Sequence, residues 1–358
     1  MLPLDSQAPR RILVRGVNWV GDAVMSLPAL TALGRACPQA EITVLAKPWV
    51  APVYSACPAV ARVMAMDPDQ HDGLAGLRRL AAGMRGQGFD WAVLMQNAFG
   101  AALMAWLARI PVRIGYRRDG RGLLLTHAAP CGADVRGVHE TAYYLHLLHA
   151  VGLAPEPPAV GVQPELHLSQ ADQAWAAGFL AGERVGQGPL LGLAPGAAFG
   201  PAKCWPAQRF AAAAAQIMDQ GFGAALLFGS SGEAAATAAV AAGLGGRRVV
   251  DLAGRTGLGQ ALALLSRLDL FITNDSGLMH AAAALGAATV AVFGSTNPKT
   301  TAPLGPRVAL VRHAVDCAPC KKPVCPQGDL RCFAGIEAEE VAAAGLALWR
   351  GGQAEDGA

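Results

Sequence analysis

Polar and flexible residues gather where an apolar run meets an apolar helical pattern, in the stretch LDLFITNDSGLMHAAAALG. They are Asn274, Asp275, Ser276, Gly277 and His280. Asp or Ser at such a junction can cap the helix by accepting hydrogen bonds from its unpaired amides. One cap needs one residue, so the group also predicts an anion site, because the helix start directs amides and a positive dipole end outward. A single helical histidine such as His280 is more often packed than functional.

A second loop combines glycines with one lysine, in APGAAFGPAKCWPAQRF. Gly196 and Gly200 keep side chains away, and Lys203 adds a cation before a helical pattern, which favours a phosphate cradle. The spacing is not that of a Walker loop, and an ordinary glycine turn with a solvated lysine is the alternative. A third loop, FGSTNPKTTAPLG, adds Ser295 and Thr296 as further candidate donor-binding residues.

A carboxylate follows the first apolar run, in RGVNWVGDAVMSLPAL. Asp22 can be the N-cap of the next helix, or a general base that accepts a hydroxyl proton at a strand end. Position alone does not separate these two hypotheses. Gly16 and Gly21 do not supply the G-x-G-x-x-G spacing of a dinucleotide-binding loop, so a nicotinamide-dependent oxidoreductase is a weak alternative.

Short apolar runs alternate with Ala/Leu-rich helical patterns along the whole chain, which predicts parallel sheets with helices on both faces. A Pro/Gly-rich stretch, residues 152–188, separates two such series. The pattern therefore predicts an α/β protein with two facing, doubly wound, Rossmann-like domains, at residues 1–180 and 181–358. Ligands of such sheets bind beyond the carboxyl ends of the strands, where all four loops above are expected.

Composition limits the class of protein. The 358 residues are 53% apolar, yet no run approaches the ~20 apolar residues of a membrane-spanning helix. Charged residues near the N-terminus interrupt any signal-peptide pattern, so a soluble, cytoplasmic protein is expected. The formal charge of +3 is too small to indicate a nucleic-acid partner.

Four blocks of sequence, in this order, resemble those of the bacterial ADP-heptose:lipopolysaccharide heptosyltransferases of type II, in glycosyltransferase family nine. They are ILVRGVNWVGDAVMSLPAL, LAPGAAFGPAKCWP, NDSGLMHAAAALG and FGSTNPKTTAPLG. The resemblance covers residues 11–336 and implies a GT-B fold, with an N-terminal acceptor domain and a C-terminal nucleotide-sugar domain. It implies inverting transfer of L-glycero-D-manno-heptose from ADP-heptose onto the heptose of the lipopolysaccharide inner core.

The resemblance also assigns residues. It matches Asp22 to the catalytic base, Lys203 to the residue that meets the donor phosphates, and Asp275 to a donor-binding aspartate. The remaining positions of the donor motif are Ser276, Gly277, Leu278 and His280. Cys204 departs from the family, which usually has a basic residue there. Lys203 and helix amides can stabilise departing ADP without a metal, so no cofactor is expected for the chemistry. A nucleotide-sugar epimerase of GT-B architecture and a non-catalytic nucleotide-sugar or glycolipid binding module are the alternatives.

Candidate acceptor-binding residues lie in the first half of the chain. They are Asn18, Arg113, Arg117, Arg118 and Arg121, the last four within RIPVRIGYRRDGRG. Arginine forks suit the carboxylates and phosphates of a lipopolysaccharide core, although exposed arginines in a solvated loop are as ordinary. The hypothesis extends to peripheral contact with the inner leaflet of the inner membrane.

Half of the eight cysteines lie within residues 317–332, in DCAPCKKPVCPQGDLRC. They are Cys317, Cys320, Cys325 and Cys332. A Cys-x-x-Cys start followed by two more cysteines is typical of a tetrahedral thiolate site, which predicts a structural zinc or iron ion. Reduced thiols packed as small apolar groups and a disulfide are the alternatives. The Asp67–Pro68–Asp69 sequence is interpreted as a polar turn rather than as a catalytic metal site.

Overall fold

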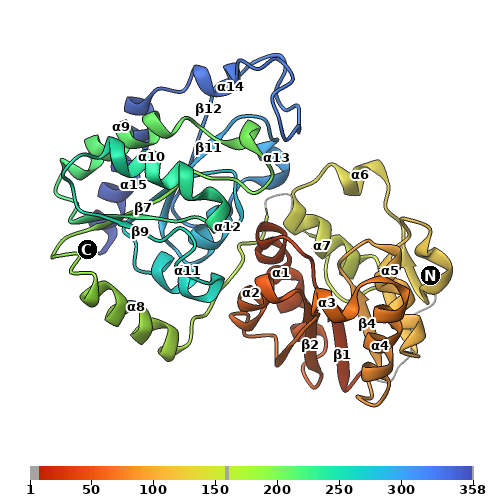
Figure 1. The fold of residues 1–358 in the computed structure, drawn as a ribbon. Coiled ribbons are helices and arrows are strands. Elements are labelled where there is room, and N and C mark those ends of the chain that lie inside the picture. Colours follow the sequence, from red (N-terminus) through yellow and green to blue (C-terminus); the bar gives the residue numbers. More distant parts are fainter. Residues whose placement is uncertain (1–7, 158–160, 357–358) are drawn as a thin grey trace. The chain divides into compact units, whose positions relative to one another are not determined.

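The computed structural model describes residues 8–157 and 161–356 and divides into two compact units, Met1–His167 and Leu168–Ala358 (Figure 1). Residues 180 and 181, where the domain boundary is expected, lie inside helix α8 (Gln170–Gly182), which packs against α11 (Leu258–Leu265) of the second unit. The prolines and glycines of the stretch 152–188 indicate a linker, so the sequence does not predict this helix. Its start is nonetheless visible in the sequence, because Ser169 and Asp172 form a capping box.

The first unit contains one parallel six-stranded sheet with the strand order β3-β2-β1-β4-β5-β6. The strands are β1 (Arg11–Arg15), β2 (Glu41–Ala46), β3 (Arg62–Ala65), β4 (Trp91–Leu94), β5 (Val112–Tyr116) and β6 (His127–Ala129). The central strands β1 and β4 are almost wholly buried, as apolar strands covered on both faces are in parallel sheets.

Helices cover both faces of this sheet. On one face α1 (Val20–Ala36) packs against α2 (Ala51–Ser55) and α7 (Glu140–His149); on the other α4 (Gly73–Arg85) packs against α3 (Pro68–His71) and α5 (Phe99–Leu107). The short elements are η1 (Pro48–Val50), η2 (Arg121–Leu124) and α6 (Ala133–Arg136). Buried side chains of α4 and α5 meet β1, β2 and β4 in one apolar core.

The second unit repeats this plan with a parallel sheet of order β12-β11-β10-β7-β8-β9. The strands are β7 (Leu190–Ala194), β8 (Ala224–Leu227), β9 (Val249–Asp251), β10 (Leu270–Asn274), β11 (Ala288–Phe293) and β12 (Val308–Arg312). Counted from the first strand of each unit, both orders are 3-2-1-4-5-6, the doubly wound order of dinucleotide-binding folds.

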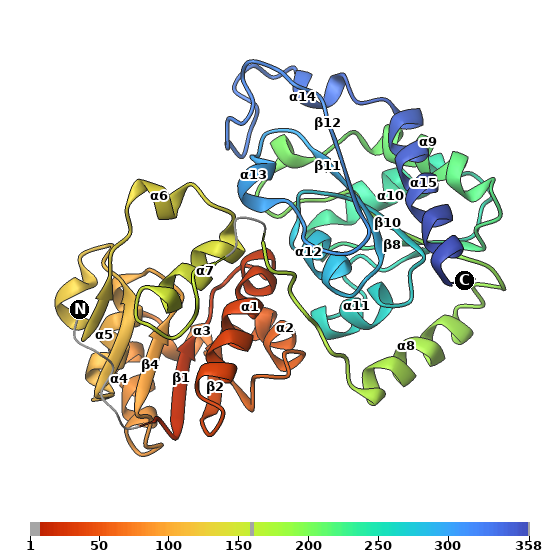
Figure 2. The ribbon, with the colours of Figure 1, turned by 180° about the vertical axis from the view of Figure 1, so that it is seen from behind.

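On one face of the second sheet lie α9 (Ala207–Met218), α10 (Ala234–Gly243) and α15 (Ala338–Asp356), which can be followed in Figures 1 and 2. On the other face α11 contacts both α8 and α12 (Gly277–Ala284). The short elements are η3 (Pro201–Lys203), η4 (Ser231–Glu233), α13 (Pro298–Thr301) and α14 (Arg331–Ala334). In the part of the chain that the structure describes, no helix is both long and apolar enough to cross a membrane.

Candidate functional site

The topology selects one edge of each sheet as the place for a ligand. In the 3-2-1-4-5-6 order, chain connections leave in opposite directions from the two middle strands, and ligands bind in the crevice beyond their carboxyl ends. In the first unit these strands are β1 and β4, and in the second they are β7 and β10. Asp22 follows β1, Lys203 follows β7, and Asp275 follows β10. The catalytic candidate and the two charged donor candidates therefore come from the switch points of the two sheets.

Tight packing shapes the loop after β1. The amide of Val17 donates to the hydroxyl of Tyr54 at 2.8 Å, and the Tyr54 ring lies against Gly16, where a β-carbon would collide with it. Burial of the whole Tyr54 side chain raises its pKa to about 12, with the negative charge of Asp22 among the smaller contributions. Gly16 is thus required for packing, which explains a loop glycine that fits no nucleotide-binding fingerprint.

Asp22 lies in the first turn of α1 and is half-buried. The N-cap of α1 is Trp19, whose side chain makes no capping hydrogen bond, so the structure does not use Asp22 as the N-cap. A carboxylate in the first turn still interacts favourably with the helix dipole. Burial raises the pKa of Tyr144 well above its ordinary value, and the charge of Asp22 contributes to that rise. Asp22 therefore stands near two buried tyrosines, Tyr54 and Tyr144.

Asn18 is held from two sides. Its Oδ1 accepts a hydrogen bond from Arg15 at 2.9 Å, and its carbonyl accepts one from the indole of Trp49 at 2.8 Å. Arg15 also donates to the carbonyls of Gly16 and Leu45, and burial lowers the pKa of its guanidinium to about 10. Trp49 is half exposed, so Asn18 lies in an ordered loop that has an aromatic side chain at its rim.

Two of the arginines expected to face the acceptor are used inside the first unit. Arg121 is fully buried, donates to the carbonyls of Tyr116 and Gln96, and reaches Asn97 at 2.9 Å. Arg113 donates to the carbonyls of Leu124, Ile110 and Pro111 near the start of β5, far along the strand from its carboxyl end. Both guanidiniums hold loops together, and this differs from the predicted presentation to an acceptor.

The other two arginines follow β5 at its carboxyl end. Arg117 is exposed and Arg118 is half-buried, and both line an open, shallow hollow of about 520 Å³. Arg118 bonds to the hydroxyl of Tyr143, an interaction that raises the pKa of the guanidinium. The same hydroxyl accepts from Asn97 at 2.7 Å. Arg117 and Arg118 are therefore at the ligand edge, and Tyr143 links Arg118 to the loop that follows β4.

In the second unit Lys203 and Asp275 form an ion pair. The Lys203 Nζ lies 2.8 Å from an Asp275 carboxylate oxygen, with the side chains 18% and 6% exposed. The ammonium also lies 5.2 Å from the centre of the Phe199 ring, within cation–π range. This ion pair explains why an aspartate lies beside the predicted anion site, because Asp275 orients Lys203. An ammonium has three N–H donors, so binding Asp275 leaves capacity for a phosphate.

Asn274 fixes the lysine loop to β10. Its side chain is fully buried, accepts from the amide of Trp205 at 2.9 Å, and donates to the carbonyl of Pro195 at 2.7 Å. The loop between Pro195 and Trp205, which contains Lys203, is thus held at both ends by one amide side chain. The sequence places Asn274 at the end of an apolar run but does not predict this structural role. A buried side chain that joins two loops by hydrogen bonds leaves no spacing pattern in the sequence.

The rest of the donor motif surrounds the start of α12. Ser276 is its N-cap by position, but its hydroxyl makes no capping bond and lies 3.1 Å from the Thr273 hydroxyl. Gly277 and Leu278 are half-buried, and His280 is buried in the first turn. The amides at this helix start are therefore not covered by a side-chain cap from Ser276.

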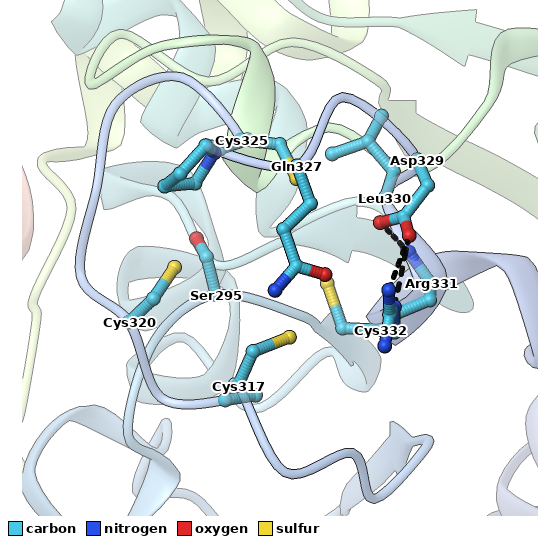
Figure 3. Close-up of a pocket in the computed structure, with 12 residues that line it drawn as sticks. Ser295, Cys317, Cys320, Cys325, Gln327, Asp329, Leu330, Arg331 and Cys332 are labelled. Atoms are coloured by element: carbon cyan, nitrogen blue, oxygen red, sulfur yellow. Dashed lines mark hydrogen bonds and ion pairs between the residues drawn. The ribbon is translucent and has the colours of Figure 1, made fainter.

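Two hydroxyls after β11 stand out by their burial. The hydroxyl oxygens of Ser295 and Thr296 are buried, and neither has a hydrogen-bond partner among the described residues. A buried polar group without a partner usually marks a place for water, an ion or a ligand. Ser295 is predicted to bind the donor. In the structure it lines a cavity together with the four cysteines of residues 317–332 (Figure 3).

All four clustered cysteines line one cavity of about 60 Å³, whose sulfur atoms Figure 3 shows. All are free thiols; Cys332 is buried and the others are half-buried. Backbone amides of Leu330, Gln327 and Gly328 lower the pKa of the Cys325 thiol, whereas burial and then the charge of Cys317 raise the pKa of Cys332. Within residues 8–157 and 161–356, no three His, Cys, Asp or Glu side chains are already arranged to hold a metal ion.

Glu233 is a further polar residue at the second ligand edge that sequence reasoning missed. It lies against Gly196, where a β-carbon would collide with its carboxylate, and it accepts from the amide and hydroxyl of Ser230 at 2.7 and 2.8 Å. The stretch FGSSGE reads as a serine-glycine turn, so the signal was only its position after β8. Asp67, in contrast, caps α3 by accepting from the Asp69 amide, in agreement with the turn interpretation.

Two Rossmann-type units, each with charged loops at its switch point, define the GT-B class of glycosyltransferases. Residues 77–330 match glycosyltransferase family 9 (heptosyltransferase). The chain is 35% identical over 318 residues to lipopolysaccharide heptosyltransferase 2 of Escherichia coli K12, covering 84% of this chain and 88% of that protein. It is 33% identical to lipooligosaccharide heptosyltransferase 2 of Haemophilus ducreyi, with the same coverage.

A solved structure gives the same result. The structure of E. coli ADP-heptose lps heptosyltransferase II superimposes with a TM-score of 0.82 at 30% identity, covering 96% of this chain and 99% of that one. The chain therefore belongs to glycosyltransferase family 9, and it is a glycosyltransferase of the heptosyltransferase type. The predicted family, enzyme class and doubly wound α/β fold are confirmed.

Proposed function

We propose that this enzyme transfers L-glycero-D-manno-heptose from ADP-heptose onto the heptose of the lipopolysaccharide inner core. Family membership and relatives named as heptosyltransferase 2 support the reaction class, the nucleotide-sugar donor and the lipopolysaccharide acceptor. The observation that carries the proposal to the residues is the Lys203–Asp275 pair at the switch point of the second sheet. A half-buried, oriented ammonium beside a helix start suits the diphosphate of such a donor.

The donor is assigned to the second unit. Lys203 binds the diphosphate, Asp275 holds the lysine in place, and the amides at the start of α12 face the negative charge. Ser276, Gly277 and Leu278 are proposed to lie against the donor, with His280 behind them. Ser295 and Thr296, in the separate loop after β11, are also proposed as donor-binding residues. The positive charge comes from Lys203 and the amides, so the proposed chemistry requires no cofactor. Cys204, where the family usually has a basic residue, contributes no such charge.

The acceptor is assigned to the first unit, with Asp22 as general base. The carboxylate removes the proton from the attacking hydroxyl as its oxygen bonds to the anomeric carbon. The bond between that carbon and the diphosphate oxygen breaks, and the electron pair leaves with ADP. Attack opposite the leaving group inverts the configuration at the sugar carbon. Asn18, Arg117 and Arg118 are proposed to contact the acceptor.

We also propose that Arg117 and Arg118 favour peripheral contact with the anionic surface on the cytoplasmic side of the inner membrane. Their position at the ligand edge and the exposure of Arg117 support this, since basic side chains near an anionic surface each add attraction. Arg113 and Arg121 are left out of this surface because carbonyls of the first unit already bind their guanidiniums.

The decisive assay uses ADP-heptose and a lipopolysaccharide core truncated after its first heptose. We expect ADP release matched by one added heptose on the acceptor, detected by mass spectrometry. A core that lacks the first heptose and a donor such as ADP-glucose are the controls. Loss of donor without gain by the acceptor would contradict transfer, and epimerised nucleotide sugar would favour the epimerase alternative. In a thermal-shift screen ADP should stabilise the protein and NAD should not.

A further inference from the structure

Four thiols converge on one small cavity in the second unit. Cys317, Cys320 and Cys325 come from the segment that follows β12, and Cys332 comes from α14. The cavity of about 60 Å³ exceeds the ~10–15 Å³ that one water molecule occupies. The rest of its lining combines small residues with Gln327, Asp329, Leu330 and Arg331, and it does not include Lys203 or Asp275. None of the chemistry proposed above uses these thiols.

We propose that Cys317, Cys320, Cys325 and Cys332 bind one structural metal ion, zinc or iron, in tetrahedral thiolate coordination. A Cys-x-x-Cys pair followed by two further cysteines supplies the four soft ligands that both ions accept. The ligand set is complete within 317–332, so the site closes a single loop. No other residue type is needed.

The turn at Cys325 is built to present a sulfur atom. Gly328 adopts φ +74°, a left-handed conformation that favours glycine, and its amide donates to the Cys325 carbonyl at 3.2 Å. Cys325 lines the cavity together with the other three cysteines, so this turn places a fourth sulfur-bearing side chain at the same small space.

A second observation concerns Ser295. Its hydroxyl is buried, lines the same cavity and has no hydrogen-bond partner among the described residues. A cavity with thiols and an unpartnered hydroxyl is suited to a polar or charged occupant rather than to an apolar one. Gln327 also lines the cavity (Figure 3). Because no three ligand side chains among the described residues are already arranged to hold a metal, binding requires the sulfurs to close around the ion.

The metal would hold the segment that supports the donor loops. The Pro323 carbonyl accepts from the amide of Ala202 at 3.0 Å, directly before Lys203. The Lys321 amide donates to the Ser295 carbonyl at 2.8 Å. At Gly200, φ is +140° and a β-carbon would collide with Pro323, so the two segments touch closely. This consequence, unlike the metal site itself, depends on the proposed donor role of Lys203.

The test measures metal in protein purified without chelator, alongside the Cys317→Ser/Cys320→Ser variant and a Cys131→Ser control. We expect about one equivalent of zinc or iron in the parent and the control, and less than about a tenth in the double variant. Elemental analysis distinguishes the two ions. Cobalt(II) reconstitution of the apoprotein should give the visible bands of a tetrahedral thiolate site.

If the double variant does not fold, chelation of the folded parent replaces it. Released metal should be accompanied by a lower melting temperature, by faster proteolysis within 317–332, and by restoration of both on adding metal back. A parent with less than about a tenth of an equivalent, even after anaerobic reconstitution with Zn²⁺ or Fe²⁺, would overturn the proposal. A denatured thiol titration would then assign the cluster: eight thiols mean packed cysteines, and fewer mean a disulfide. If the parent takes up no metal after this reconstitution but still binds ADP, the metal site alone is overturned and the proposed donor role of Lys203 stands.

Discussion

The ligand edges of the two units use charge in different ways. At the edge of the second unit a lysine and an aspartate form a nearly buried pair, and a buried asparagine ties their loops together. At the edge of the first unit Asp22 stands beside buried tyrosines, while the buried guanidiniums of Arg15 and Arg121 bind backbone carbonyls. The second edge thus holds an oriented ion pair, as the proposed donor site requires, and the first presents a carboxylate in the first turn of α1.

The difference shows that one residue type serves opposite purposes in one segment. Arg113 and Arg121 act as internal braces, whereas Arg117 and Arg118 reach the ligand edge. Replacing Arg113 or Arg121 should lower the stability of the protein, because their carbonyl partners would be left without a hydrogen bond. Replacing Arg117 or Arg118 should leave stability unchanged and alter acceptor binding. The comparison therefore predicts which substitutions alter function and which alter folding.

The largest effect is expected at Asp22. Asp22→Asn keeps the size and polarity of the side chain but removes the group that accepts the proton, so turnover should fall roughly 10²- to 10⁴-fold. ADP affinity, assigned to the other unit, should not change. Steady-state kinetics and calorimetry measure the two quantities separately. Asp134→Asn, the same change in the exposed first turn of α6, should leave turnover unaffected. Near-normal turnover in Asp22→Asn would remove Asp22 from the mechanism.

The second effect separates binding from stability at the ion pair. Lys203→Ala should weaken ADP binding by about 1.5–3 kcal/mol, roughly tenfold to 150-fold, because a charged hydrogen bond to the diphosphate is lost. It should also destabilise the protein, since it leaves the 6%-exposed Asp275 without its ion-pair partner. Calorimetry with ADP and denaturant unfolding measure the two losses.

The double variant Lys203→Ala/Asp275→Asn sharpens this prediction. Removing both charges should recover much of the stability, but ADP affinity should stay low. Lys299→Ala, at an exposed lysine in α13, is the matched control for a general loss of positive charge. If the double variant recovered ADP binding together with stability, Lys203 would be a structural partner of Asp275 and not a donor ligand.

Most of the fold could be predicted from the sequence because parallel strands covered on both faces are continuous apolar runs. Apolar runs mark eleven of the twelve strands in the described residues; β6 has none, since its three residues, His-Ala-Ala, carry no β-branched side chain. The two units divide between His167 and Leu168, before the expected boundary, because α8 begins within a Pro/Gly-rich stretch and belongs to the second unit. The strand order itself came only from the structure, as pairing across a crossover has no local signal.

The candidate site was predictable where function requires a residue type at a strand end. Asp22, Lys203 and Asp275 all follow middle strands. Their partners were not predictable, because the Lys203–Asp275 contact joins residues 72 positions apart in the chain. Burial also decided between alternatives that spacing left open, as at Arg121, whose guanidinium is enclosed although its sequence neighbours are exposed.

A smaller effect is expected at the rim of the first unit. Arg117→Glu/Arg118→Glu should raise the acceptor Michaelis constant about tenfold at low salt and less at high salt, because exposed charges are screened. ADP affinity should not change. The control is Arg78→Glu/Arg79→Glu, an adjacent exposed pair on α4 with the same change in net charge. An equal rise in both variants, or none at low salt, would show that the two edge arginines do not face the acceptor.

The smallest effects are expected from alanine substitutions of two serines, Ser169 and Ser276, at helix N-caps of the second unit. Ser169 accepts from the Asp172 amide at 3.1 Å, so Ser169→Ala should cost about 1 kcal/mol of unfolding free energy and leave ADP affinity unchanged. Ser276 makes no capping bond, and its Thr273 neighbour keeps a 2.9 Å bond to the Asn274 carbonyl. Ser276→Ala should therefore barely alter stability but weaken ADP binding about two- to fivefold, as loss of one neutral hydrogen bond does. Denaturant unfolding should detect a loss of stability in Ser169→Ala, and calorimetry should detect weaker ADP binding in Ser276→Ala. Should Ser276→Ala behave like Ser169→Ala in both measurements, the start of α12 would be an ordinary helix end and the donor would have to be bound by Lys203 without it.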